Sequence, residues 1–133
     1  MVPALFFYCL LPDISFGNSI LRLIGHQKIL GVSTHTLDQA KKAVLDGADY
    51  IGVGPIFKSP TKPREILPGL DFARQIAGEI RIPAVAIAGI TQQNVDEVLA
   101  TGLKAIAVTA AVIGCENVET AARDLKEKMK RTR

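Results

Sequence analysis

The stretch PAVAIAGITQQNVDEVLATGLKAIAVTAAV, residues 83–112, holds two apolar segments with a more polar segment between them. Residues 83–89 and 105–112 are apolar at nearly every position rather than at alternate positions. Strands with this pattern are buried on both faces, which is typical of a parallel sheet covered by helices. Because residues 91–102 read as a helix, the stretch predicts a strand, a helix and a second parallel strand.

The same alternation continues on both sides of this stretch. Further strands are predicted over residues 28–34 and 49–55, and further helices over residues 36–47, 69–80 and 117–132. Four βα units therefore follow one another, which predicts an α/β fold with parallel strands and outer helices.

Helical spacing of apolar residues predicts which side of two helices faces the core. Thr36 and Gln39 are expected to form a capping box at the start of helix 36–47, and Gly47 is expected to end it. The expected inner residues are Leu37, Ala40 and Val44 in that helix, and Val118, Ala122, Leu125 and Met129 in helix 117–132.

The N-terminal part is apolar but less regular. MVPALFFYCLL, residues 1–11, is too short to span a bilayer and lacks the positive flank of a signal peptide. We interpret residues 5–11 as one more buried strand and residues 15–25 as one more helix, which adds a fifth unit. The chain is expected to be cytoplasmic, with no membrane partner.

Length and composition fit one α/β domain spanning residues 1–133. The chain has 133 residues, of which 48% are apolar and 5% aromatic, and a net charge of +3. Much of the positive excess lies in residues 126–133, which we expect to be a solvated helix end, and no basic patch alternates with aromatic residues. Nucleic-acid binding is therefore not favoured. Cys9 and Cys115 match no metal or redox spacing, and we expect both to be small buried residues in a reducing compartment.

The long irregular connection from about Ile56 to Pro68 directly follows a predicted strand. Within it, GVGPIFKSPTKP (residues 52–63) places the hydroxyls of Ser59 and Thr61 beside the ammonium group of Lys62. Hydroxyl groups and a lysine suit anionic oxygens, and prolines stiffen such a loop. Two interpretations stay open, which are a site for a phosphorylated ligand and an ordinary proline-rich surface turn.

Two later strand ends carry small residues. Gly89 follows the strand over 83–89, and Thr109 lies near the end of the strand over 105–112. Backbone N–H groups at such turns bind phosphate, and in eight-unit α/β barrels the phosphate site lies after the last two strands. The alternative is that Gly89 and Gly114 are simple turn glycines.

A third strand end, GVSTHT (residues 31–36), carries Ser33 and His35. A histidine there is a candidate acid or base. The commoner role is donation to a backbone carbonyl, and this is the interpretation that we favour for His35.

Read together, GVSTHT, GVGPIFKSPTKP, PAVAIAGI and AIAVTAAVIG resemble the C-terminal part of thiamine-phosphate synthases over residues 28–133, whereas residues 1–27 match poorly. The resemblance implies a (β/α)8 TIM barrel of which this chain holds about the last five units. It also implies a transferase that joins hydroxymethylpyrimidine diphosphate to thiazole phosphate and releases pyrophosphate, with Mg²⁺ as cofactor.

Residue by residue, the resemblance implies that Ser33 and Lys62 are catalytic and bind the diphosphate. Residues Ser59, Pro60 and Thr61 would contact thiazole phosphate. Its phosphate would be bound through backbone groups of the remaining matched residues, which are Gly89, Thr109 and Ala110.

The sequence also departs from the family pattern. Ala110 stands where the family usually has serine, and Ala88 stands where it often has a first glycine. The first three strands, with their pyrimidine-binding residues and the aspartates that hold magnesium, have no counterpart that we recognise, and Asp13 does not match in context. We therefore expect either self-association or a missing N-terminal segment, and we identify no metal ligand.

Three other functions stay open. One is a non-catalytic phosphate-binding relic or regulatory module. Another is the related thiazole tautomerase, an isomerase whose catalytic histidine matches His35. The last is a barrel enzyme for sugar or indole phosphates, which the loop sequence disfavours.

Overall fold

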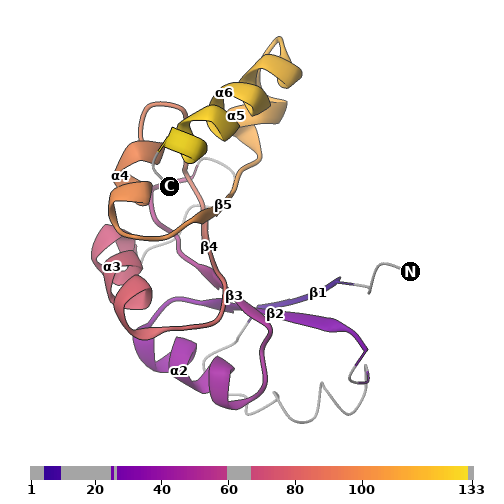
Figure 1. Ribbon diagram of the computed structural model, residues 1–133, viewed down its shortest axis with the longest axis vertical. Helices are drawn as coiled ribbons and strands as arrows, with labels where there is room; N and C mark the ends of the chain where they lie inside the picture. Colours follow the sequence, from indigo (N-terminus) through magenta and orange to yellow (C-terminus); the bar gives the residue numbers. More distant parts are fainter. Residues whose placement is uncertain (1–4, 10–24, 26, 60–66, 132–133) are drawn as a thin grey trace.

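The computed structural model describes residues 5–9, 25, 27–59 and 67–131. Five parallel strands form one sheet in the order of the sequence. Every strand therefore pairs with the next one along the chain, as the βα alternation predicts (Figure 1). The strands are β1 (Leu5–Cys9), β2 (Ile29–Thr34), β3 (Tyr50–Val53), β4 (Ala84–Ile87) and β5 (Ala105–Ala107).

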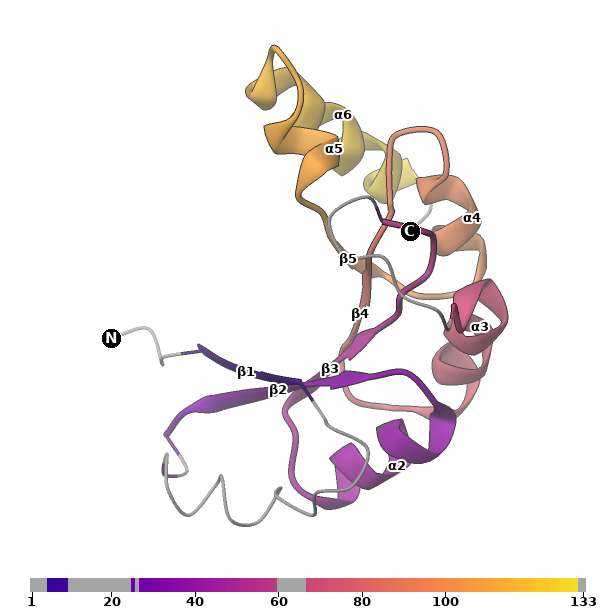
Figure 2. The same ribbon diagram turned by 180° about the vertical axis from the view of Figure 1, so that it is seen from behind.

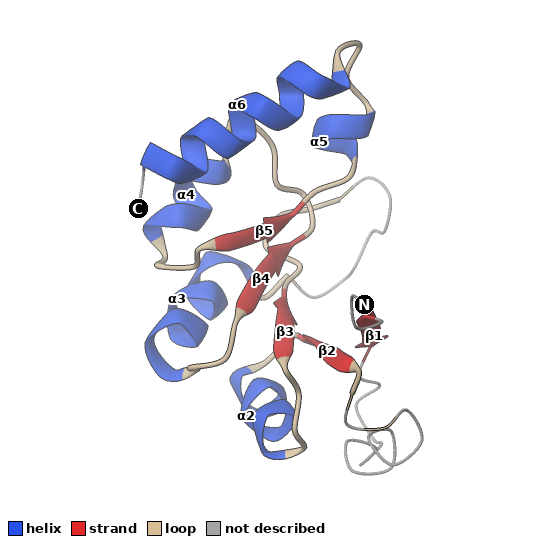
Figure 3. Ribbon diagram, turned by 45° about the vertical axis from the view of Figure 1, so that its right-hand side comes forward, coloured by secondary structure: helices blue, strands red, loops and turns tan. Residues whose placement is uncertain are grey.

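The sheet is curved, and helices cover one of its faces. Figures 1 and 2 show α2, α3 and α4 on the same side of the strands. Figure 3 shows α6 running past α4, with the short helix α5 before it. The helices are α2 (Leu37–Leu45), α3 (Gly69–Glu79), α4 (Val95–Ala100), α5 (Ala110–Ile113) and α6 (Val118–Arg131).

The core lies between the strands and these helices. Ile51 and Val53 of β3 and Ile76 of α3 are completely buried. On β3 these residues alternate with Tyr50 and Gly52, which pair with Gly31 and Ser33 of β2 and face the other side of the sheet. Burial raises the pKa of the Tyr50 phenol above its ordinary value.

Thr36 caps α2 as predicted, but the side chain of Gln39 bonds to a different backbone amide from the one that a capping box uses. Thr36 Oγ1 accepts a hydrogen bond from Gln39 N at 3.2 Å, and Gly47 ends the helix with φ 90°. Gln39 Oε1, however, accepts from His35 N at 2.9 Å. The side chain of Gln39 therefore fixes the residue before the cap, at the end of β2.

Two predicted helix faces are partly wrong. In α2, Ala40 and Ala43 are buried, whereas Val44 is 38% exposed. In α6, Leu125 is buried as predicted and Met129 packs against the core, but Val118 and Ala122 are exposed, and Ala121 is buried in their place. The buried face of each helix is rotated by about one residue, because its neighbours and not its own apolar residues determine which side is covered.

The end of the last predicted strand is also wrong. The prediction extended it over residues 105–112, but β5 ends at Ala107 and Ala110–Ile113 forms α5. Thr109 O accepts hydrogen bonds from Val112 N at 3.1 Å and Ile113 N at 2.8 Å. Ala110 and Ala111 favour this turn because alanine has the highest helix propensity.

The remaining N-terminal and cysteine predictions have mixed outcomes. The predicted strand is present as β1, Leu5–Cys9. Cys115 is exposed rather than buried, because it follows α5 at the surface, where its Sγ donates to Ala111 O at 3.3 Å. The side chain of Cys9, and the helix predicted over 15–25 apart from Gly25, lie outside the described residues. Among the described helices, none is long and apolar enough to cross a membrane.

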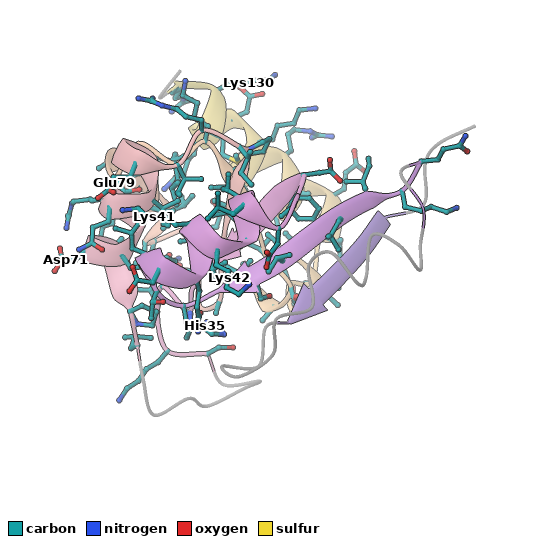
Figure 4. The ribbon with its side chains drawn as sticks, turned by 90° about the horizontal axis from the view of Figure 1, so that it is seen from below. His35, Lys41, Lys42, Asp71, Glu79 and Lys130 are labelled. Atoms are coloured by element: carbon teal, nitrogen blue, oxygen red, sulfur yellow. The ribbon has the colours of Figure 1, made fainter. Side chains whose placement is uncertain are left out.

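Polar contacts join neighbouring helices. Figure 4 shows Lys41 of α2 beside Glu79 of α3, and their charged groups are 2.7 Å apart. The hydrogen bond to Glu79 raises the pKa of Lys41, although such an exposed pair contributes little to stability. On α6, Lys128 Nζ donates to Gln92 O at 2.6 Å, and Gln92 Nε2 donates to Ala121 O at 2.9 Å. These contacts hold α6 against the turn that precedes α4.

Candidate functional site

A pocket of about 280 Å³ lies beyond the carboxyl ends of three neighbouring strands. Lys58 and Ser59 line it from the connection after β3, and residues 88–91 line it from the turn after β4. Residues 107–111 complete it from the end of β5. Parallel α/β folds bind their ligands at this end of the sheet, because the connections that follow adjacent strands meet there.

The connection after β3 is held against the end of β4. Ile56 N donates to Ile87 O at 3.0 Å, and Phe57 N donates to Ala88 O at 3.2 Å. Gly54 permits this approach, because a Cβ at that position would lie 2.5 Å from Ile87 O. Lys58 and Ser59 are thereby placed directly beside the turn after β4.

The turn after β4 directs its carbonyl groups into the protein. Ala88 and Gly89 have φ values of 74° and 67°. Gly89 O accepts from Asn94 Nδ2 at 2.9 Å, and Thr91 N donates to Asn94 Oδ1 at 2.8 Å. The amides of Gly89 and Ile90 donate to no acceptor within the described residues, which leaves two N–H groups at this turn for an anion, as in anion-binding turns.

The turn after β5 contributes in a similar way. Ala110 N and Ala111 N precede the first hydrogen bonds of α5 and have no acceptor in the part of the chain that the structure describes. Thr109 is exposed, and its side chain makes no capping hydrogen bond. Ala110 adds only a methyl group. The pocket is therefore lined by the residues of two turns, whose side chains are mostly small or apolar, together with Lys58 and Ser59.

Four of the residues predicted for the site lie together in this pocket, namely Ser59, Gly89, Thr109 and Ala110. Ser33 does not line it. Ser33 lies at the end of β2, only 3% exposed, and pairs with Gly52. Pro60, Thr61 and Lys62 lie outside the described residues, as does Asp13.

His35 has the structural role favoured from the sequence. Its Nδ1 lies 2.7 Å from Gly54 O. Since a carbonyl only accepts, Nδ1 carries the proton and donates. The neighbouring Thr34 is buried, and its Oγ1 donates to Gly52 O at 2.8 Å. Both side chains thus join the end of β2 to the end of β3.

Lys58 is a residue of the pocket that the sequence analysis missed. It is the only charged side chain among the described residues that line the pocket. The available signal was its position next to Ser59 in a connection that follows a strand. That signal is weak, because exposed lysines are common in loops.

No group of three or more His, Cys, Asp or Glu side chains that could hold a metal ion occurs within residues 5–9, 25, 27–59 and 67–131. These residues do not fit the magnesium site that the resemblance implies.

The fold and the pocket define a parallel α/β protein of the kind that binds its ligand at the carboxyl ends of its strands. A family model described as thiamine monophosphate synthase matches residues 18–112. The chain belongs to the thiamine monophosphate synthase family.

Individual relatives agree with this assignment. The chain is 52% identical over 106 residues to a thiamine-phosphate synthase of Chloroflexus aurantiacus, covering 79% of this chain and 49% of the relative. It is 44% identical over 114 residues to that of Alkaliphilus oremlandii, covering 86% and 54%. The chain thus spans about half the length of these curated relatives.

A solved structure is similar as well. The thiamine phosphate pyrophosphorylase from Pyrococcus furiosus superposes with a TM-score of 0.81 at 32% identity. The match covers 98% of this chain and 60% of that structure.

Proposed function

We propose that this chain carries part of the active site of a thiamine-phosphate synthase, a transferase of thiamine biosynthesis. The reaction joins hydroxymethylpyrimidine diphosphate to thiazole phosphate and releases pyrophosphate. The observation that carries the proposal is the pocket that the turns after β4 and β5 line together with Ser59, because the amides of Gly89, Ile90, Ala110 and Ala111 in these turns have no acceptor among the described residues. Phosphate oxygens suit such donors.

The proposed residue roles divide between the two substrates. The amides around Gly89 and Thr109–Ala110 bind the phosphate of thiazole phosphate, and Ser59 to Thr61 contact the same molecule. Ser33 and Lys62 bind the diphosphate. The bond between the pyrimidine methylene carbon and the diphosphate oxygen breaks with its electron pair on pyrophosphate, and the thiazole nitrogen forms the new bond to that carbon. The protein needs to position the nitrogen and stabilise negative charge, so no strong base is required.

We further propose that the five strands belong to a (β/α)8 barrel, as about its last five units. Five sequential parallel strands with helices on one face support this architecture. The remaining strands would come from a second copy or from a segment outside this chain. A monomer by light scattering at micromolar concentration would contradict self-association. Mg²⁺ is proposed as cofactor from the family resemblance alone, because no group of side chains that could hold it is found among the described residues.

The proposal is tested by product formation. The chain, both substrates and Mg²⁺ are incubated, and thiamine phosphate is measured by mass spectrometry. Lys62→Ala is expected to lower turnover by about 100-fold or more, because it removes a charge that stabilises the leaving group. Lys104→Ala, an exposed lysine before β5 at the opposite end of the sheet, is the matched control.

The outcome separates the transferase from a binding module. A folded chain that binds thiazole phosphate and forms no product would contradict catalysis by copies of this chain alone and favour the non-catalytic alternative. Equal turnover of Lys62→Ala and Lys104→Ala would contradict the role of Lys62.

His35 distinguishes the synthase from the tautomerase, which the named relatives do not favour. His35→Ala removes the hydrogen bond to Gly54 O. We expect the free energy of unfolding to fall by about 1 kcal/mol, with turnover largely retained. His35→Asn, which keeps a donor, should lose less stability in the same urea titration. Unchanged stability together with abolished turnover would give His35 a chemical role instead.

A further inference from the structure

The backbone groups that line the pocket carry no net charge. Apart from Lys58, the polar side chains among the described lining residues are the hydroxyl groups of Ser59, Thr91 and Thr109. A phosphate monoester ligand carries up to two negative charges. Neutral donors orient its oxygens, and a cation adds a stronger, charge-assisted hydrogen bond that neutral donors do not supply.

Lys58 is the described residue placed to supply that cation. It lines the pocket, and its side chain is exposed. No aspartate or glutamate is among the described lining residues, so no carboxylate competes for its ammonium group there. Lys41, Lys42, Lys128 and Lys130 all form ion pairs, whereas Lys58 forms none with the residues that the structure describes.

The backbone of Lys58 is fixed relative to the turn after β4. A Cβ at Gly89 would lie 2.6 Å from Lys58 O and 2.7 Å from Phe57 Cβ, so the two segments are in direct contact. The hydrogen bond from Phe57 N to Ala88 O, at 3.2 Å, holds them together. The stem of Lys58 therefore starts beside Gly89.

We propose that Lys58 binds the phosphate group of the ligand and determines specificity for the phosphorylated thiazole over the thiazole alcohol. The inference rests on the proposed function, because it assigns a residue to the phosphate end of the same pocket. Lys58 acts on the phosphate end alone, so its contribution should be absent for a ligand that lacks the phosphate.

Calorimetry on the full chain tests this assignment with two probes, thiazole phosphate and the corresponding thiazole alcohol. Lys58→Gln should weaken binding of thiazole phosphate about 10- to 100-fold, as expected for one charge-assisted hydrogen bond. It should leave binding of the alcohol unchanged. Lys58→Arg should restore most of the affinity, and Lys104→Gln should bind both probes as the unmodified chain does.

Salt and thermal melting provide two further checks. Binding of thiazole phosphate should weaken with added NaCl, and it should do so less in Lys58→Gln. Because the side chain is exposed, the melting temperature should not change, which shows that the variant is folded.

The outcomes are distinct. Unchanged thiazole phosphate affinity in Lys58→Gln overturns the inference and leaves the proposed function intact. Equal loss for both probes also overturns it, because the effect would then not come from charge on the phosphate. An unmodified, folded chain that binds neither probe overturns the proposed function and the inference together.

Discussion

Gly89→Ala is expected to abolish measurable binding of thiazole phosphate and to lower the free energy of unfolding by about 2–5 kcal/mol. Gly89 has φ 67°, a left-handed conformation that alanine adopts at a cost. Its new Cβ would lie 2.6 Å from Lys58 O and 2.8 Å from Phe57 C, which are backbone atoms. Relief of that contact requires the turn to move away from the connection after β3, and the amides of the pocket would move with it.

The matched control for this variant is Gly78→Ala in α3. A Cβ at Gly78 would meet no atom within 4 Å, and the residue is exposed within a helix. We expect this substitution to raise stability by about 0.5–1 kcal/mol and to leave binding unchanged. Urea denaturation and calorimetry measure both quantities, and Gly89→Ala with normal stability and affinity would contradict the assigned geometry.

Gly54→Ala is expected to separate the connection after β3 from the turn after β4, which line the pocket from two sides. The added Cβ would lie 2.5 Å from Ile87 O and 3.2 Å from Ile56 N. Since both are backbone atoms, the strain should cost about 1–3 kcal/mol of stability or more. The hydrogen bonds from Ile56 N and Phe57 N to the end of β4, at 3.0 and 3.2 Å, should break first.

Hydrogen exchange measures this effect directly. The amides of Ile56 and Phe57 should exchange much faster in Gly54→Ala, while the amide of Ile76, in the middle of α3, keeps its protection. Thiazole phosphate should bind more weakly, because Lys58 and Ser59 would no longer lie against Gly89. Unchanged protection of Ile56 and Phe57 would contradict the prediction.

The candidate site was predicted in part. Gly89 was predicted because it follows an apolar strand, and Thr109 because it lies near the end of the next one, since the carboxyl ends of adjacent parallel strands meet at one edge. Ala110 was predicted through the family resemblance. Ser59 was predicted from its hydroxyl next to Thr61 and Lys62. Lys58 was not, because its place in the pocket depends on hydrogen bonds between the connection after β3 and the end of β4. No local pattern in the sequence encodes that contact.

For Ser33, the local position was predicted correctly but the place relative to the pocket was not. Its position at a strand end was correctly predicted, but it lies at the end of β2 and does not line the pocket. Strand-end residues share an edge of the sheet without sharing a pocket. The distance across intervening strands decides which of them meet.

The sequence by itself determined the order of strands and helices and the parallel sheet, because continuous apolar segments alternate with helical ones. Only the tertiary structure decided where those segments end. The β4–β5 ladder stops at the pair Ile87–Ala107, and Ala88, with φ 74°, turns β4 away. Residues 108–112 then have no continuing strand to pair with on that side, so Ala110–Ile113 satisfies its backbone groups as a helical turn instead. An apolar run of alanine and valine is compatible with a strand and with a helical turn. Whether a neighbouring strand is there to pair with it determines which of the two forms.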